Sequence, residues 1–142
     1  MSKRRISDEI IQKMIREAIK AREHSYSPYS HFKVGACAYM GDGKLYSASN
    51  VENASYPCGS CAERNALFRG VNEGERRAYA IAIVGGMNQL VDTFPCGLCR
   101  QTIREFADPA DLLIIIAKSE QEYKTYLLDE LLPESFGPED LK

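Results

Sequence analysis

The 142-residue chain lacks several features that mark other classes of protein. Its longest strongly apolar stretch, residues 112–117, is far shorter than the roughly 20 residues that a membrane-spanning helix needs. The first residues include no apolar stretch of the kind found in a signal peptide. No repeat, low-complexity segment or linker interrupts the sequence. We therefore expect one domain over residues 1–142, located in the cytoplasm and without membrane contact.

Neither sign of charge dominates the composition. Eighteen Lys and Arg residues against 20 Asp and Glu residues leave a formal net charge of −2. Proteins that bind duplex nucleic acid usually present a basic face, so we expect no nucleic-acid partner. Histidine is also scarce, because His24 and His31 are the only two. Neither lies at ligand spacing to a cysteine, and we expect both on the surface or in loops.

The pattern of apolar residues alternates between helix and strand periods. Steps of three and four residues predict a helix over 7–23 that is capped by Ser7. Residues 123–128 fit either a fifth strand or the start of a short helix. This alternation predicts an α/β fold in which helices pack on a five-stranded sheet. The other expected helices are 61–71 and 97–106, and the other expected strands are 34–40, 45–48, 79–84 and 112–117.

Four of the five cysteines form two Cys-x-x-Cys pairs, which is a spacing typical of zinc ligands. The pairs are Cys58 with Cys61 and Cys96 with Cys99. Four thiolates would close the site around a structural metal. Three would leave a position where zinc could hold and ionise a water molecule. The spacing alone does not decide between these two sites.

Glu63 favours the open site, because a carboxylate beside the metal is what proton transfer to and from a water requires. A helix is expected to follow each cysteine pair, whereas the pairs of a small zinc ribbon usually lie on hairpin turns. The chain is also long enough to build a core without a metal. A solvent-exposed helix glutamate is the alternative interpretation of Glu63.

Several segments together closely resemble the small homotetrameric cytidine deaminases. Cys61-Ala62-Glu63 and Pro95-Cys96-Gly97-Leu98-Cys99 match the zinc deaminase signature. The segments SPYSHFKVGA (27–36), NVENASYP (50–57) and SFGPEDL (135–141) are similar to that family as well. The resemblance implies a three-layer α/β/α fold with a mixed five-stranded sheet. It also implies hydrolytic deamination of cytidine and deoxycytidine in pyrimidine salvage.

The same resemblance assigns the residues of the metal site. It implies one Zn²⁺ per chain, held by Cys61, Cys96 and Cys99, with Glu63 as the proton carrier. Cys58 is then left without a role, at a position that is usually not cysteine in the family. We expect Cys58 to be a buried thiol, and an exposed thiol near the site is the alternative.

Three thiolates on Zn²⁺ leave one net negative charge and weaken the metal as a Lewis acid. Donors directed at the sulfurs would counter this effect. Arg64 and Arg100 follow the ligand segments directly, and we expect Arg64 to be the stronger donor. Ordinary surface arginines are the alternative for both.

The remaining site residues also come from the resemblance. Asn50 and Glu52 match a pair that binds the ribose hydroxyls, although both are also ordinary turn residues. Phe32 matches an aromatic residue that packs on the pyrimidine, and a core phenylalanine is the competing interpretation. The residues implied near a subunit boundary are Ala54, Tyr56 and Phe136, in a homotetramer with shared sites.

Three other functions stay open from the sequence. The first is a closed four-cysteine zinc module used for structure or binding. The second is deamination of cytosine in a polynucleotide, which the acidic composition and the Asn50/Glu52 pair argue against. The third is deamination of another nucleoside-like substrate, because the zinc motif specifies the chemistry and the pocket specifies the substrate.

Overall fold

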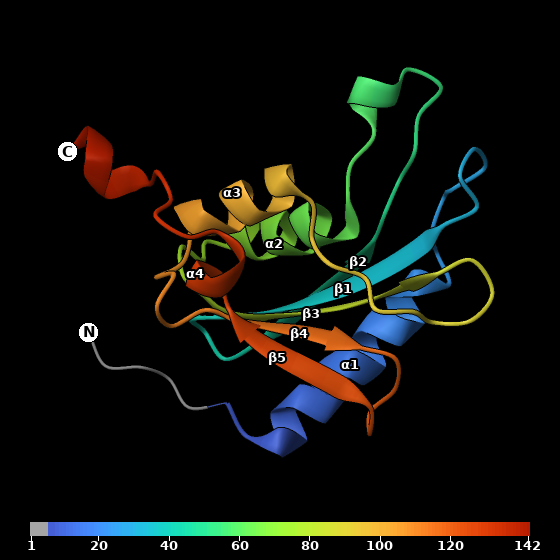
Figure 1. Ribbon diagram of the computed structural model, residues 1–142, viewed down its shortest axis with the longest axis horizontal. Helices are drawn as coiled ribbons and strands as arrows, with labels where there is room; N and C mark the ends of the chain where they lie inside the picture. Colours follow the sequence, from blue (N-terminus) through green and yellow to red (C-terminus); the bar gives the residue numbers. More distant parts are fainter. Residues whose placement is uncertain (1–5) are drawn as a thin grey trace.

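The computed structural model describes residues 6–142 (Figure 1). The N-terminal residues 1–5, on which the expectation about a signal peptide depends, lie outside the described part. The helices are α1 (Asp8–Arg22), α2 (Ala62–Asn72), α3 (Gly97–Glu105) and α4 (Leu128–Leu131). The strands are β1 (Lys33–Met40), β2 (Leu45–Ser49), β3 (Ala78–Gly86), β4 (Leu113–Ala117) and β5 (Tyr123–Leu127). Two short 3₁₀ turns cover Tyr56–Cys58 and Pro138–Leu141.

The five strands form one mixed sheet in the order β2-β1-β3-β4-β5. β1 pairs antiparallel with both β2 and β3, and β4 pairs antiparallel with β5. Only β3 and β4 run parallel, and α3 lies between them along the chain. This arrangement confirms the expected mixed five-stranded sheet.

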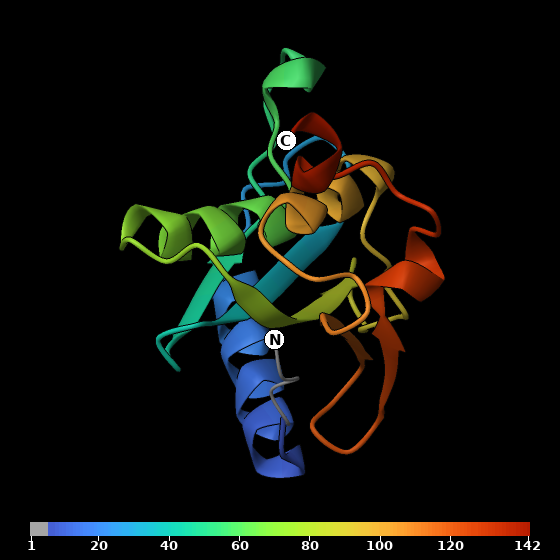
Figure 2. The ribbon, with the colours of Figure 1, turned by 90° about the vertical axis from the view of Figure 1, so that its left-hand side faces the viewer.

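Helices cover both faces of the sheet, which confirms the expected three-layer α/β/α fold. Figure 2 shows α1 on one side of the sheet and α2 with α3 on the other. Buried apolar residues of α1, among them Met14 and Ile15, pack against one face of β3 and β4. Leu67 of α2 and Ile103 of α3 belong to the core on the opposite face. The sequences of β3 and β4 are therefore nearly continuous apolar runs, because both faces of these strands are buried.

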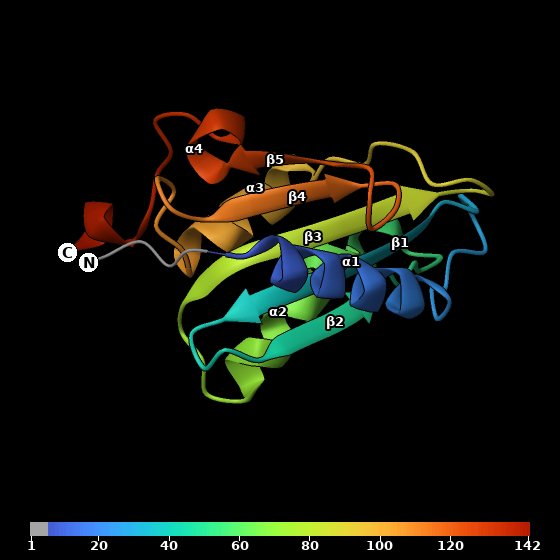
Figure 3. The ribbon, with the colours of Figure 1, turned by 90° about the horizontal axis from the view of Figure 1, so that it is seen from below.

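The start of α1 follows the sequence expectation closely. Ser7 is the N-cap, and its hydroxyl oxygen accepts a hydrogen bond from the Ile10 backbone N–H at 3.2 Å. Figure 3 shows this helix lying across the sheet. None of the helices in residues 6–142 combines the length and the apolar character that a bilayer crossing requires.

The conformation of two regions could not be predicted from the sequence alone. Both alternatives for residues 123–128, a strand and the start of a short helix, are present. β5 ends at Leu127 and the short helix α4 begins at Leu128. The connection from β2 to α2 projects away from the layers, with the Tyr56–Cys58 turn at its tip (Figure 1). Side chains from Asn53 to Cys58 are all exposed on this projecting loop.

Candidate active site

Three cysteine sulfurs lie together where α2 and α3 begin. The Sγ atoms of Cys61 and Cys96 are 3.9 Å apart, and those of Cys96 and Cys99 are 3.6 Å apart. All three sulfurs lie within 4.8 Å of one another. Tetrahedral zinc with Zn–S bonds of about 2.3 Å places its sulfurs about 3.8 Å apart. The cluster therefore has the dimensions of a zinc site.

The local structure favours ionised sulfurs at this position. Cys61 is the N-cap of α2 and Cys96 is the N-cap of α3, so two positive helix ends meet at the cluster. The pKa of Cys61 is lowered to about 5 by hydrogen bonds from Cys99 and Arg64, with the Cys99 bond the larger cause. The pKa of Cys99 is raised, because its thiol donates to Cys61. A divalent cation bound here would displace that proton, because metal ligation requires each cysteine as its thiolate.

Cys58 lies outside this cluster and is exposed, so the expectation that it is a buried thiol is wrong. It belongs to the short turn Tyr56–Cys58 on the projecting loop, where no layer covers it. Its side chain lines a separate cavity of about 610 Å³ between the end of α1 and β2. None of the three clustered cysteines lines that cavity, although it is larger than the cavity of about 500 Å³ described below. The geometry thus contradicts a closed four-cysteine site.

Glu63 is buried in the first turn of α2, with only 4% of its surface exposed. Burial raises the pKa of its carboxyl to about 7. A carboxyl group with this pKa can both accept and release a proton near neutral pH. Its position two residues after Cys61 places an acid–base group next to the sulfur cluster.

Arg64 extends from α2 toward the sulfurs. Its Nη2 donates to Cys61 Sγ at 3.6 Å, as expected for a donor that offsets thiolate charge. The Arg64 Nε is buried and has no hydrogen-bond partner among the described residues. An unpaired buried donor is costly. We therefore expect this nitrogen to donate a hydrogen bond to a group that is bound at the site.

Arg100 has different partners from the ones expected. Its guanidinium donates to the backbone carbonyl oxygens of Pro95 at 2.7 Å and Leu131 at 2.6 Å. These bonds tie the backbone just before Cys96 to the end of α4. Arg100 therefore supports the shape of the ligand loop, whereas donation to a sulfur was the expectation.

A cavity of about 500 Å³ opens beside the cluster and includes Cys61 and Arg64 in its wall. Asn50, Glu52 and Tyr56 line the same cavity, so it brings together five of the residues expected at the site. Tyr29 stands near Tyr56, with ring centroids 6.3 Å apart. The cavity has the volume of a small-molecule pocket.

The Glu52 carboxylate is held in this cavity by the loop that precedes β1. It accepts backbone N–H bonds from Tyr29 at 3.0 Å and Ser30 at 3.1 Å, together with a bond from the Ser30 hydroxyl. The Ser30 hydroxyl bond holds the pKa of Glu52 below its usual range. Glu52 is thus a fixed, ionised acceptor. Ser30 and Tyr29 were not predicted as site residues, although both lie in the segment SPYSHFKVGA that carries part of the resemblance.

Asn50 uses its side chain to shape the protein backbone. Its Oδ1 accepts from the Ser25 hydroxyl at 2.5 Å and from the Val34 N–H at 3.0 Å. Its Nδ2 donates to the Phe32 carbonyl oxygen at 3.0 Å. Asn50 therefore joins the end of β2 to the start of β1, a role that the sequence did not indicate.

Three of the residues expected to bind the substrate do not line the cavity beside the cluster. Phe32 is half-buried and borders a separate depression with Met87 and Gln89. Ala54 is exposed on the projecting loop. Phe136 is 57% exposed in the C-terminal segment. Within one chain, the structure brings the metal cluster and the Asn50/Glu52 pair together and leaves these three apart.

Comparisons with known proteins agree with this geometry. The family described as the cytidine and deoxycytidylate deaminase zinc-binding region matches residues 8–115. A cytidine deaminase of Halalkalibacterium halodurans is 44% identical over 130 residues, which cover 92% of this chain and 96% of that protein. A cytidine deaminase of Sporosarcina psychrophila is 39% identical over 131 residues, covering 92% and 94% of the two chains.

Solved structures show the same likeness. The crystal structure of a cytidine deaminase from Burkholderia pseudomallei has a TM-score of 0.78 and 40% identity, covering 87% of this chain and 97% of that chain. The cytidine deaminase of Mycobacterium tuberculosis has a TM-score of 0.75 and 35% identity, covering 88% and 95%. The chain, with its three-sulfur zinc site, belongs to the cytidine and deoxycytidylate deaminase family.

Proposed function

We propose that this chain hydrolyses the exocyclic amine of cytidine and deoxycytidine, giving uridine or deoxyuridine and ammonia, as in pyrimidine salvage. The observation that carries the proposal is the buried Glu63 beside a cluster of three sulfurs. Because Cys58 is not in the cluster, a fourth ligand position is left for water. The relatives named cytidine deaminase support the same activity.

Cys61, Cys96 and Cys99 would hold one Zn²⁺ per chain. When bound, zinc supplies a Lewis acid that lowers the pKa of water from about 15.7 toward 7. Arg64 draws charge from Cys61 by donating to its sulfur, and this keeps the site more electrophilic. The three sulfurs and Arg64 together set the charge of the site.

Glu63 would carry the proton in the reaction. Its carboxylate accepts a proton from the attacking water and delivers it to N3 of the pyrimidine. It then helps to protonate the amine as the bond between C4 and that amine breaks. The raised pKa of about 7 suits both steps, because the group gains and loses a proton at little cost.

The nucleoside would bind in the cavity beside the cluster. Its volume of about 500 Å³ lies within the usual range for small-molecule sites, about 300–1,000 Å³. Glu52 would accept hydrogen bonds from the ribose hydroxyls, held in place by Ser30 and Tyr29. Asn50 supports the same sugar subsite, chiefly by fixing the backbone at Phe32 and Val34.

The complete site would be shared between subunits of a homotetramer. Tyr56 is 77% exposed and Phe136 is 57% exposed, and Ala54 is exposed beside Tyr56. Exposed aromatic side chains on ordered segments are typical of surfaces that a partner covers. In the same proposal, Phe32 packs against the pyrimidine once the sites are assembled. The reducing cytoplasm suits a site that needs three free thiolates.

The test is an ultraviolet assay of zinc-loaded protein with cytidine and deoxycytidine, beside Glu63→Gln. The proposal predicts turnover by the wild type and a loss of at least about a hundredfold in the variant. Zinc content per chain, measured on the same samples, should be equal in the two proteins. No turnover by a wild type with one zinc per chain would refute the proposed substrates.

A further inference from the structure

The C-terminal segment after α4 is held in place by polar contacts and not by a core. Between Pro133 and Lys142 the only buried residue is Gly137, which has no side chain. Hydrophobic burial therefore cannot explain why this segment has a defined position. The contacts that hold it all come from α3.

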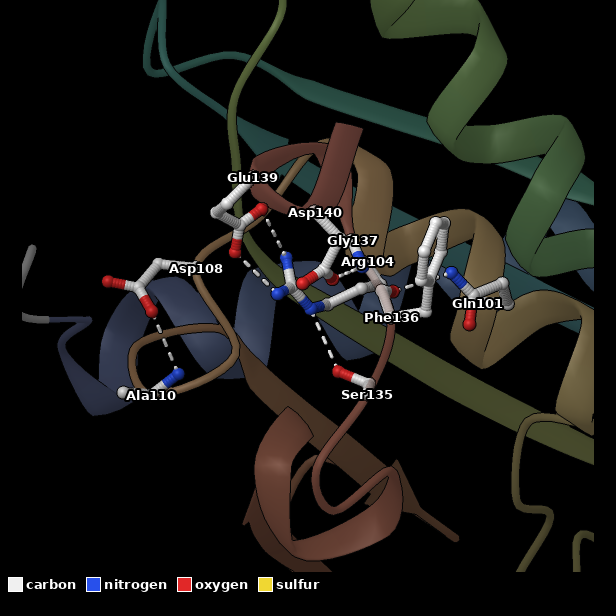
Figure 4. Close-up of polar contacts among 9 residues, drawn as sticks. All are labelled: Gln101, Arg104, Asp108, Ala110, Ser135, Phe136, Gly137, Glu139 and Asp140. Carbon is white, nitrogen blue, oxygen red and sulfur yellow. Dashed lines mark hydrogen bonds and ion pairs between the residues drawn. The ribbon is translucent and has the colours of Figure 1, made fainter. Parts of the chain in front are cut away.

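Arg104 supplies most of these contacts (Figure 4). Its Nε donates to the Ser135 hydroxyl at 2.8 Å. Its two terminal nitrogens donate to the Glu139 carboxylate at 2.5 Å and 3.2 Å, which makes a bidentate ion pair. The Arg104 side chain is only 8% exposed whereas that of Glu139 is 65% exposed, so a surface carboxylate neutralises a buried cation.

The segment between these two partners is fitted to the guanidinium. A Cβ atom at Gly137 would lie 2.3 Å from Arg104 Cζ, so a side chain at this position would collide with the ion pair. The neighbouring Phe136 carbonyl oxygen accepts a bond from Gln101 at 2.9 Å. The backbone at Phe136 is thus held on both sides, while 57% of the surface of the residue stays exposed.

An exposed aromatic ring on an anchored segment is typical of a contact with a partner, and Phe136 does not line the cavity of its own chain. In Figure 1 the C-terminal segment lies on the opposite side of α2 and α3 from the projecting loop that carries Tyr56. Leu98, on α3 as well, is 68% exposed. An apolar surface of this kind is typical of a contact between proteins, and the open cavity of a second copy offers exposed aromatic walls.

We propose that Arg104 is a positioning residue, which anchors the C-terminal segment through Ser135 and Glu139 so that Phe136 completes the site of a second copy of this chain. The inference deepens the proposed function and rests on it. Arg104 lies on α3 five residues after Cys99, about 7.5 Å along the helix axis. α3, which begins at two of the sulfurs of its own site, thereby also sets the position of the Phe136 ring for the site of the second copy.

The test uses full-length, zinc-loaded Glu139→Gln, which removes the charge of a mostly exposed partner. We expect a KM for cytidine about tenfold higher, the effect of losing one charge-assisted hydrogen bond, with kcat changed less than about twofold. Glu134→Gln is the matched control, because it makes the same chemical change in the same segment outside the Arg104 contacts. It should keep the wild-type KM.

Two further variants separate positioning from a general loss of structure. Gly137→Ala should raise KM in the same way without any change in charge. In Phe136→Ala/Glu139→Gln, the second change should add nothing to the effect of Phe136→Ala, because both act through the same ring. Additive effects in this double variant, or a wild-type KM in Glu139→Gln, would overturn the inference.

Sedimentation over a range of protein concentrations gives a readout that does not depend on activity. Glu139→Gln should dissociate at concentrations where the wild type and Glu134→Gln remain associated. An active wild type that is monomeric throughout would overturn the inference and leave the proposed activity intact. An inactive wild type would refute the proposed activity. In that case KM cannot be measured, and equal sedimentation behaviour of all three proteins would refute the role of Arg104.

Discussion

Arg64 occupies an unusual position for an arginine, with one terminal nitrogen on Cys61 Sγ and a buried Nε that has no hydrogen-bond partner among the described residues. A cation here offsets the excess negative charge of three thiolates. The same contact contributes to the low pKa of Cys61. Arg64 should therefore affect both how tightly zinc is held and how electrophilic it is.

We predict that Arg64→Gln lowers kcat/KM for cytidine or the affinity for zinc by about 10- to 100-fold, the usual effect of removing such a partner. Zinc affinity is measured by competition with a chromogenic chelator, and turnover by ultraviolet absorbance. Arg69→Gln is the control, since Arg69 lies on the same helix and donates to the Ser47 carbonyl oxygen. Unchanged affinity and turnover in Arg64→Gln would remove this role.

At the residue scale, the sequence predicted the groups that have a short-range pattern. The three clustered cysteines and Glu63 follow from spacing and from the resemblance. Ser30 and Arg104 gave no such signal, because their partners Glu52 and Glu139 are 22 and 35 residues away in the chain. Only folding brings these pairs together, so no local motif records them.

At the scale of elements, the contact between α1 and β1 sets how closely a helix can approach the sheet. A Cβ atom at Gly35 would lie 2.0 Å from the Ala18 carbonyl oxygen. Backbone atoms of a helix cannot move aside as a flexible side chain can. Gly35 thus permits the close packing of this layer.

We predict that Gly35→Ala destabilises the protein by roughly 1–3 kcal/mol, the usual cost of overpacking. Thermal unfolding at one fixed protein concentration measures the effect. Gly97→Ala is the control, because a Cβ atom at Gly97 would meet nothing within 4 Å, and alanine is favoured over glycine inside a helix. A Gly35→Ala midpoint equal to the wild type would contradict the packing argument.

The sequence located elements better than it arranged them. Strands β3 and β4 were evident as apolar runs because both of their faces are buried. The exposed and half-buried residues of β5 fitted a strand or a helix, and the chain in fact changes from one to the other at Leu128. Strand order depends on contacts between distant segments, so the α/β/α arrangement came from the resemblance and not from periodicity.

At the scale of the whole molecule, zinc joins two helices that the chain separates. Cys61 begins α2, whereas Cys96 and Cys99 belong to the start of α3, with β3 between them. Binding to the folded site but not to the unfolded chain adds to stability. The metal should therefore hold the layer above the sheet together as well as serve the reaction.

We predict that removal of zinc with a chelator lowers the free energy of unfolding by about 4 kcal/mol, relative to protein at a zinc concentration of 1,000 times Kd. Differential scanning calorimetry with and without the chelator measures the change. Cys61→Ser, which lacks one ligand, should show a much smaller response. An identical thermal midpoint for zinc-loaded and zinc-free wild type would contradict a structural contribution of the metal.

The central claim is that three cysteines hold a catalytic zinc and that Cys58 is not a ligand. The most direct measurement compares zinc per chain and cytidine turnover in Cys58→Ser and Cys96→Ser. We predict that Cys58→Ser keeps one zinc and wild-type turnover, whereas Cys96→Ser loses turnover and most of its zinc. Loss of zinc from Cys58→Ser would contradict the claim and would identify a closed four-cysteine site.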